Sequence, residues 1–165
     1  MKRTLQVLND LEAGSILTRY AIGGAMGATF YMEPTLTFAL EVLVVLPRTS
    51  GGLHSMAGLY ENLRRCGYSE EGEHAIIAGM PVQFLPAYNP LLEEALTEAR
   101  EMFYENVPTR VLRSEHLIAI CLHTGRGKDR ERVGTLCSQA KLDMEYLEAV
   151  ISRHQLREQW NQWRP

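Results

Sequence analysis

The sequence contains few cysteines, and they lie far apart. Cys66, Cys121 and Cys137 form neither a Cys-x-x-Cys pair nor a Cys/His zinc pattern. An odd number of distant thiols is typical of reduced cysteines in a cytosolic protein. The spacing therefore argues against a disulfide framework and a structural zinc site, and we expect a cytoplasmic protein.

Long hydrophobic runs and a strong excess of one charge are also absent. The most apolar run, residues 42–46, is far too short to span a bilayer. The first residues, Met-Lys-Arg-Thr-Leu-Gln, lack the apolar segment of a signal peptide. The chain has 17 Lys and Arg against 20 Asp and Glu, a net charge of -3. We expect no membrane partner, and this net charge does not indicate a nucleic-acid partner.

The chain has enough apolar residues to fold around a core of its own. Its 165 residues are 45% hydrophobic and 22% charged, which is ordinary for a globular protein. Strand and helix patterns alternate first, and helical patterns follow. We therefore expect a single domain over 1–165, with an α/β core over about 1–113 and a helical C-terminal cap over about 114–165. The predicted fold class is α/β (α+β), a small mixed β-sheet flanked by helices.

The clearest predicted element is a strand over residues 40–46. It is apolar on both faces after Glu41, as expected for a central strand covered on both sides. Residues 75–77 and 80–85 predict a hairpin around Gly79. Other predicted elements are an opening helix around residues 5–11, a helix over 54–66, a helix from Asn89-Pro90 to about 103, and a strand over 109–112.

The last third of the sequence predicts helices only. We expect Ser114 to cap a helix that runs through Leu122, and residues 125–127 to end it. Two further helices are expected over 128–139 and from an Asp143 cap to residue 154. Trp160 and Trp163 lie on a short terminal helix, where they pack internally or against a partner subunit.

The most informative pattern begins with Gly23-Gly24. A short helix follows, and then an apolar strand that begins after Thr37-Phe38-Ala39. The pattern resembles the small bacterial nucleotidyltransferases that include the AbiEii-type toxins, in which Gly-Gly and a helix precede (S/T)-x-D-(I/L)-D at the head of an apolar strand. The resemblance continues through residues 81–86, 115–120, 125–130 and 153–154, so it covers nearly the whole chain. It implies a nucleotidyltransferase fold, with Gly23, Gly24 and Thr37 at a nucleotide.

The chemistry of such enzymes requires carboxylates in pairs. Transfer of a nucleoside monophosphate is an in-line displacement at phosphorus, and two Mg²⁺ ions stabilise the attacking and leaving oxygens. Carboxylates at i and i+2 on a strand point to one face and hold both ions. A Gly-Gly turn allows backbone amides to approach the triphosphate.

This sequence departs from the pattern at the metal ligands. The first aspartate position holds Ala39, which has no ligand atom, and the second holds Glu41. A third carboxylate is often supplied by a neighbouring strand, and the matching position, Gln83, offers only an amide oxygen. Glu41 is thus the one candidate catalytic and metal-binding residue, and Ala39 and Gln83 are degenerate positions. We expect two-metal binding to be weakened or lost.

A basic segment follows Gly125, and two interpretations of it remain open. The resemblance suggests that Lys128 or its neighbours, Arg132 among them, contact the triphosphate. Alternatively, Lys128 and Arg132 lie at i and i+4 on a solvated helix start, where Asp129 favours the first turn. AbiEii-type toxins tend to carry a lysine on the preceding helix, and the matching position here is Cys121.

Three functions are compatible with these residues. The first is a nucleotidyltransferase that uses a nucleoside triphosphate and Mg²⁺. The second is a degenerate relative that binds a nucleotide without transfer chemistry and needs no other cofactor. The third is an interaction protein, with a protein partner or a second copy of itself, in a toxin–antitoxin or defence system. Ala39 argues against the first, and the Gly-Gly turn with the basic segment favours the second.

Overall fold

A seven-stranded mixed sheet forms the centre of the computed structural model, which describes residues 1–48 and 56–165. The strands lie in the order β3-β4-β5-β2-β1-β7-β6. Their bounds are β1 Arg19–Ile22, β2 Leu40–Val45, β3 Ser69–Glu71, β4 His74–Ile77, β5 Met80–Pro86, β6 Arg100–Tyr104 and β7 Val107–Val111. The predicted mixed sheet with flanking helices is therefore confirmed, although it is wider than expected.

Eight helices in the described part of the chain surround the sheet. They are α1 Lys2–Ala13, α2 Gly24–Ala28, α3 Ala57–Arg65, α4 Pro90–Thr97, α5 Ser114–Thr124, α6 Gly127–Gln139, α7 Met144–Arg153 and α8 Arg157–Trp163. Among these residues no helix has the length and apolar character that crossing a membrane requires.

Strand β2 lies inside the sheet, as its sequence predicts. It pairs in parallel with β5 and antiparallel with β1. Val42 and Val44 join one hydrophobic cluster and Leu43 joins the other, so the strand buries apolar side chains on both faces. This strand therefore fixes Glu41, its second residue, near the middle of the sheet.

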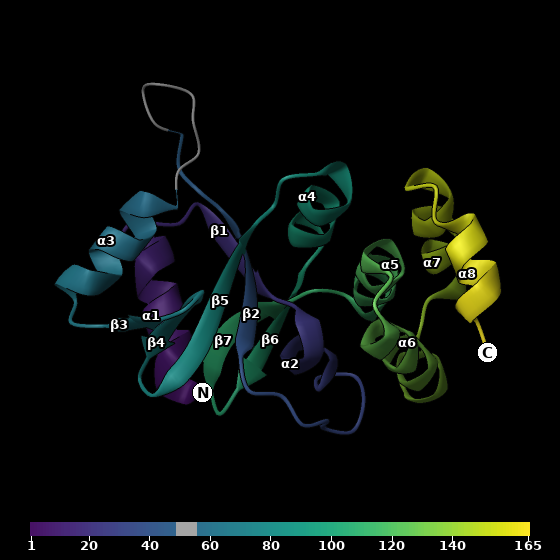
Figure 1. The fold of residues 1–165 in the computed structure, drawn as a ribbon, viewed down its shortest axis with the longest axis horizontal. Coiled ribbons are helices and arrows are strands. Elements are labelled where there is room, and N and C mark those ends of the chain that lie inside the picture. The colour runs from purple at the N-terminus through teal and green to yellow at the C-terminus, as the bar shows by residue number, and fades with distance from the viewer. Residues whose placement is uncertain (49–55) are drawn as a thin grey trace.

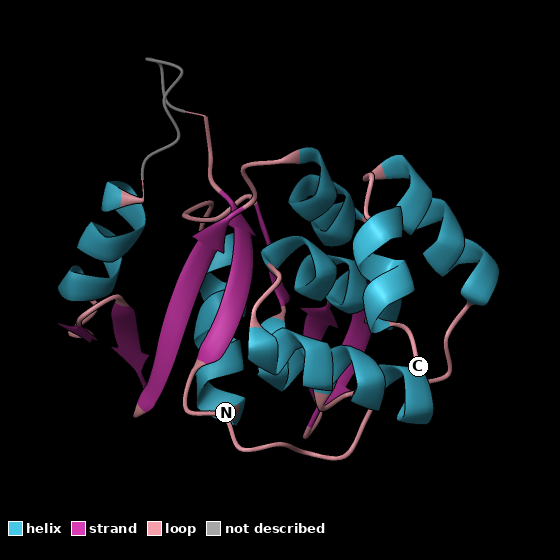
Figure 2. Ribbon diagram, turned by 45° about the vertical axis from the view of Figure 1, so that its right-hand side comes forward, coloured by secondary structure: helices cyan, strands magenta, loops and turns pink. Residues whose placement is uncertain are grey.

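The helices cover the two faces of the sheet unequally. Helices α1 and α3 pack on one face, and α4 to α8 gather on the other side (Figure 1). Figure 2 shows the same layers with the helices of the C-terminal part stacked beside the strands. The predicted helical C-terminal part thus shares its core with one face of the sheet.

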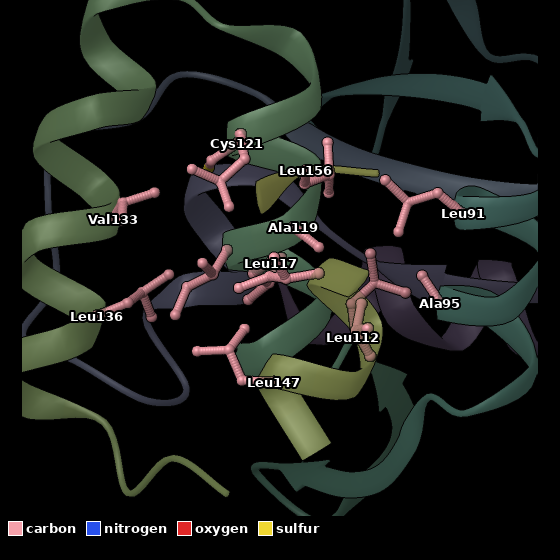
Figure 3. Packing of buried hydrophobic residues seen from close by; sticks show 14 of the residues in the cluster. Leu91, Ala95, Leu112, Leu117, Ala119, Cys121, Val133, Leu136, Leu147 and Leu156 are labelled. Atoms are coloured by element: carbon pink, nitrogen blue, oxygen red, sulfur yellow. The ribbon is translucent and has the colours of Figure 1, made fainter. Parts of the chain in front are cut away.

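Helix α5 is the centre of that second layer. It contacts α4, α6, α7 and α8, and eight of its eleven residues are buried. Figure 3 shows Leu117 and Ala119 of α5 among Val133, Leu136 and Leu147 of the neighbouring helices. Burial of such side chains contributes roughly 1.5–3 kcal/mol each, so α5 holds the turn that follows it in a fixed place.

Several predicted boundaries need correction. Helix α4 ends at Thr97 instead of running to about residue 103, because residues 100–104 form strand β6 against β7. The α5 N-cap is Arg113, and Ser114 is a buried first-turn residue. The third helix begins at Ala57, and the predicted start at residue 54 lies outside the described residues. Strand β3 was not expected.

The predicted caps at Asn89 and Asp143 are confirmed. Asn89 Oδ1 accepts a hydrogen bond from the Leu92 amide at 2.9 Å, and Pro90 follows as the first residue of α4. Asp143 Oδ1 accepts one from the Tyr146 amide, also at 2.9 Å. In both cases the side chain satisfies a backbone donor that the helix leaves unpaired.

Candidate functional site

The Gly-Gly turn lies directly against the start of β2. Strand β1 ends at Ile22, the amide of Gly23 donates to the Glu41 carbonyl at 2.9 Å, and α2 begins at Gly24. Gly24 has a φ of +57°, a conformation that side-chain-bearing residues rarely adopt. The backbone of the turn is therefore tied to the residue that carries the candidate carboxylate.

Gly24 is also required by the side chain of Glu41. A Cβ atom placed on Gly24 would lie 2.4 Å from both Cδ and Oε2 of Glu41. The carboxylate thus rests on the bare Cα of the turn, and any larger residue there forces it to move. The structure brings Gly23, Gly24 and Glu41 together, as the sequence predicts for a nucleotide site.

In the described part of the chain, the strand residues beside Glu41 supply no second carboxylate. Gln83 of β5 is its register partner, so the two side chains emerge on the same face of the sheet. Ala39 lies one residue before β2 and lines a different cavity, of about 170 Å³, together with Phe38 and His74. Within residues 1–48 and 56–165, no group of three His, Cys, Asp or Glu side chains is arranged to hold a metal ion.

Opposite Glu41, the turn between α5 and α6 presents a compact charged cluster. Asp129 is fully buried, and Arg126 donates to it from Nε at 2.7 Å and from Nη2 at 3.3 Å. Arg132 donates to the same carboxylate from Nη1 at 3.3 Å. Two arginines thus share one carboxylate, which leaves one positive charge and several N–H donors unmatched within the cluster.

The electrostatics of this cluster favour the ionised forms of Asp129 and Arg126. Burial alone would raise the pKa of Asp129, but the hydrogen bonds and charges of the arginines outweigh it, so the pKa lies below its usual range. The hydrogen bond to Asp129 raises the pKa of Arg126, and the charge of Glu41 raises it further. Glu41 therefore acts on Arg126 across the cavity.

A small cavity separates the turn, the strand and the cluster. Its volume is about 30 Å³, and its polar lining comes from Gly24, Glu41, Thr124, Arg126, Asp129 and Arg132. Cys121 also lines it, and burial raises the pKa of that thiol to about 11. The thiol is therefore neutral, and the positive charge of this wall comes from the arginines.

The other predicted site residues lie apart from this cavity. The hydroxyl of Thr37 donates to the carbonyl of Ala39 at 3.3 Å and so supports the loop before β2. Lys128 is exposed on the first turn of α6 and lies outside the cavity lining. The sequence analysis did not single out Arg126 or assign Asp129 a place in the site. The available signal was the spacing of Asp129, three residues from an arginine on each side.

The residues present fit one Mg²⁺ ion better than two. A pair of ions bridged by the protein needs at least two carboxylates at this strand, and Glu41 is the one on β2 beside the turn. Mg²⁺ is often held by one carboxylate together with substrate phosphates and water. Glu41 is suited to that role, so a magnesium–nucleotide complex fits the donor set.

Comparisons with known proteins identify the fold. No protein-family model and no curated protein matches the sequence. Among solved structures, ANT(2")-Ia in complex with adenylyl-2"-tobramycin is similar with a TM-score of 0.54 at 15% identity, over 94% of this chain and 98% of that one. The solution structure of the antibiotic-resistance factor ANT(2'')-Ia gives 0.55 at 16% identity, over 96% and 95%.

A third solved structure is similar over nearly the same range. It is an antigenic nucleotidyltransferase-like protein from Paracoccidioides brasiliensis, with a TM-score of 0.61 at 9% identity, over 96% of this chain and 88% of that one. Sequence identities this low show a similar fold and do not show a shared function. The chain therefore has the fold of nucleotidyltransferases.

Proposed function

We propose that this protein of nucleotidyltransferase fold binds a nucleoside triphosphate and has lost efficient transfer of the nucleoside monophosphate. The observation that carries the proposal is the carboxylate of Glu41 on β2, which packs against Gly24 and faces the Arg126–Asp129–Arg132 cluster across one cavity. The arginines are suited to phosphate, and the carboxylate to a single metal ion. The second carboxylate position is Ala39.

The arginine cluster supports phosphate binding through its remaining donors. A guanidinium has five N–H groups in a planar fork that matches phosphate oxygens. Asp129 occupies only some of them and holds both side chains at the cavity. Fixed donors bind an anion more tightly than mobile ones, because less side-chain freedom is lost on binding.

The cavity is smaller than a triphosphate, so binding requires one side chain to move. About 30 Å³ is room for a single water-sized group. The Arg126 side chain is 49% exposed, whereas that of Arg132 is 12% exposed. Arg126 is therefore the residue that swings outward to admit phosphates, and Arg132 is the fixed part of the wall.

Efficient transfer is lost because one of the two carboxylate metal ligands is missing. Without a second carboxylate on β2, the attacking and leaving oxygens are not both stabilised by metal charge. Glu41 and one ion support binding and at most slow transfer.

The free cysteines accord with a cytoplasmic location for this protein.

A second candidate function is protein interaction. Leu36 and Phe38, in the loop before β2, are 87% and 80% exposed, and they lie within five residues of Glu41. Large apolar side chains exposed side by side often mark a partner site. On this alternative the cavity beside Glu41 has no remaining function. The partner is another protein of a toxin–antitoxin or defence pair, or a second copy of this chain.

Calorimetric titration of ATP with Mg²⁺ distinguishes the two candidates. The proposal predicts saturable binding by the wild type and at most slow transfer from labelled ATP. If the wild type shows no nucleotide binding, while Leu36→Ser or Phe38→Ser abolishes self-association, the interaction function replaces the proposal.

A further inference from the structure

A row of polar side chains crosses one face of the sheet, starting from Glu41. Glu41 is the register partner of Gln83, and Glu71 of β3 is the register partner of His74. The antiparallel register of β4 and β5 sets His74 beside Gln83. Because register partners point to the same face of a sheet, the row continues from β2 through β5 and β4 to β3.

The face that carries this row is open to solvent beyond Glu41. On β4 and β5, alternate residues are buried in the hydrophobic cluster that also contains residues of α1 and α3: Ala75, Ile77, Val82 and Phe84. The members of the row, and their neighbours Ile76 and Pro81 on the same face, are half-buried or exposed. Helices thus cover one face of this part of the sheet, and the other face is accessible to a ligand.

A cavity of about 170 Å³ lies over the far end of the row. Glu71 and His74 of the row line it, and Ile76 and Pro81 add apolar surface. Phe38, from the loop before β2, lines it with a side chain that is 80% exposed. Among the described residues, the lining includes no lysine or arginine. The cavity therefore offers an aromatic surface and a carboxylate, and its charge repels phosphate.

Glu41 lies between this cavity and the arginine cluster. Strand β2 has β1, with the Gly23-Gly24 turn at its end, on one side and β5 on the other. Phosphates bound at the turn and at Arg132 leave the nucleoside to extend over β5 and β4. Two strand spacings, roughly 10 Å, separate Glu41 from His74, a distance that an extended nucleotide spans.

We propose that this cavity receives the base of the nucleotide, and that the base carries an exocyclic amino group, as adenine does. The base stacks on Phe38, and its amino group donates to the carboxylate of Glu71. Uracil has a carbonyl oxygen in place of the amino group, and the carboxylate repels it. The inference rests on the proposed nucleotide binding and adds the position and the choice of the base.

Comparison of ATP with inorganic tripolyphosphate, each with Mg²⁺, isolates the contribution of the base. In calorimetry the wild type should bind ATP more tightly than either tripolyphosphate or UTP. Phe38→Ala should weaken ATP binding by roughly fivefold or more, because the stacking surface is lost, and should leave tripolyphosphate binding unchanged. Glu71→Gln should reduce the preference for ATP over UTP, because an amide can donate as well as accept.

Matched variants outside the cavity provide the controls. Phe103→Ala removes a side chain that is 71% exposed on β6, and Glu73→Gln neutralises an exposed carboxylate outside the lining; both should bind ATP as the wild type does. Arg132→Ala should weaken binding of ATP and tripolyphosphate alike. Failure of the wild type to bind either ligand would refute nucleotide binding, and the base site with it. The base site alone is overturned if the wild type binds ATP and tripolyphosphate equally tightly, or if Phe38→Ala and Glu71→Gln match the wild type with ATP and UTP.

Discussion

Asp129 and Glu94 are each bound by arginine, and their surroundings differ. Asp129 is bound by arginines three residues away on either side of it, next to a cavity. Glu94 of α4 accepts from Arg153 at 2.9 Å on both oxygens, from His154 at 2.7 Å, and pairs with His116 at 3.1 Å. Its partners lie 22 to 60 residues away along the chain.

From this difference we infer that the Glu94 cluster contributes to stability and that the Asp129 cluster is available to a ligand. Glu94 joins α4 to α5 and α7, so its bonds form only when these helices are packed together. The cluster of Asp129 is local, and its spare donors point to a cavity that also contains Glu41. The Glu94 cluster forms only when distant segments pack together, so it contributes to stability. The Asp129 cluster is local and has N–H donors beyond those that Asp129 accepts, so we infer that it is suited to binding.

Removal of Glu94 should have the largest effect on stability. Glu94→Ala leaves the fully buried His116 and the nearly buried His154 without their carboxylate. We expect the free energy of unfolding to fall by about 2–4 kcal/mol, because breaking one side of a buried charged cluster leaves the other side unpaired. Urea denaturation measures it, with Glu98→Ala, an exposed neighbour, as the control. Equal midpoints for the two variants would contradict a stabilising role.

The Glu94 cluster should make the free energy of unfolding depend on pH in the acid range. Hydrogen bonds from Arg153, with smaller contributions from the histidines, lower the pKa of Glu94 from 4.5 to about 2. Its contribution is therefore complete above pH 4.5 and disappears as the pH falls toward 2. At about 1.4 kcal/mol for each pKa unit, the loss is at most about 3.5 kcal/mol, and solvent screening of Arg153, which is 51% exposed, reduces it. Glu94→Gln should remove this part of the pH dependence in urea titrations from pH 6 to 2.5, and an unchanged slope would argue against it.

Substitution of Gly24 separates backbone strain from site geometry. Gly24→Ala should cost about 1–2 kcal/mol of stability because of its positive φ. Gly72→Ala should cost a similar amount, since Gly72 has a φ of +61° and open space around it. Only the first variant displaces the Glu41 carboxylate, so only it should weaken binding of ATP with Mg²⁺. Equal nucleotide affinity of both variants would exclude Glu41 from the site.

Arg132 and Lys128 provide the finest comparison. Arg132 lines the cavity and Lys128 is exposed outside its lining. Arg132→Ala should weaken ATP binding by about tenfold or more, because a charge-assisted contact to phosphate contributes roughly 1.5–3 kcal/mol. Lys128→Ala should change the affinity little. Calorimetry on both variants tests this assignment. A larger loss of ATP affinity in Lys128→Ala than in Arg132→Ala would assign phosphate binding to Lys128 instead.

The sequence was sufficient for the parts of the fold that local patterns determine. The apolar run after Glu41 predicted β2, and Asn89-Pro90 predicted the start of α4. Strand β6 was missed because Glu98-Ala99-Arg100-Glu101-Met102 is rich in helix-forming residues. Pairing with β7, closed by a two-residue turn in which Glu105 and Asn106 have positive φ, overrides that preference.

The candidate site was predicted in part for a similar reason. Gly23, Gly24 and Glu41 are linked by a motif, so their proximity was visible in the sequence. The proposed roles of Arg126 and Arg132 depend on the burial of Asp129 on α6, which is a consequence of packing. From the sequence alone, this segment has the same composition as a solvated helix start, and Lys128 was as good a candidate as its neighbours.

Isothermal titration of the wild-type protein with ATP and Mg²⁺ decides whether this protein binds a nucleotide. We expect one saturable site with a Kd of about 1 mM or tighter, and an affinity that falls in Arg132→Ala but not in Lys128→Ala. We also expect at most slow transfer from labelled ATP incubated with the same protein. No saturable heat at several millimolar ATP would contradict the claim of binding, and efficient release of pyrophosphate would contradict the claim that transfer has been lost.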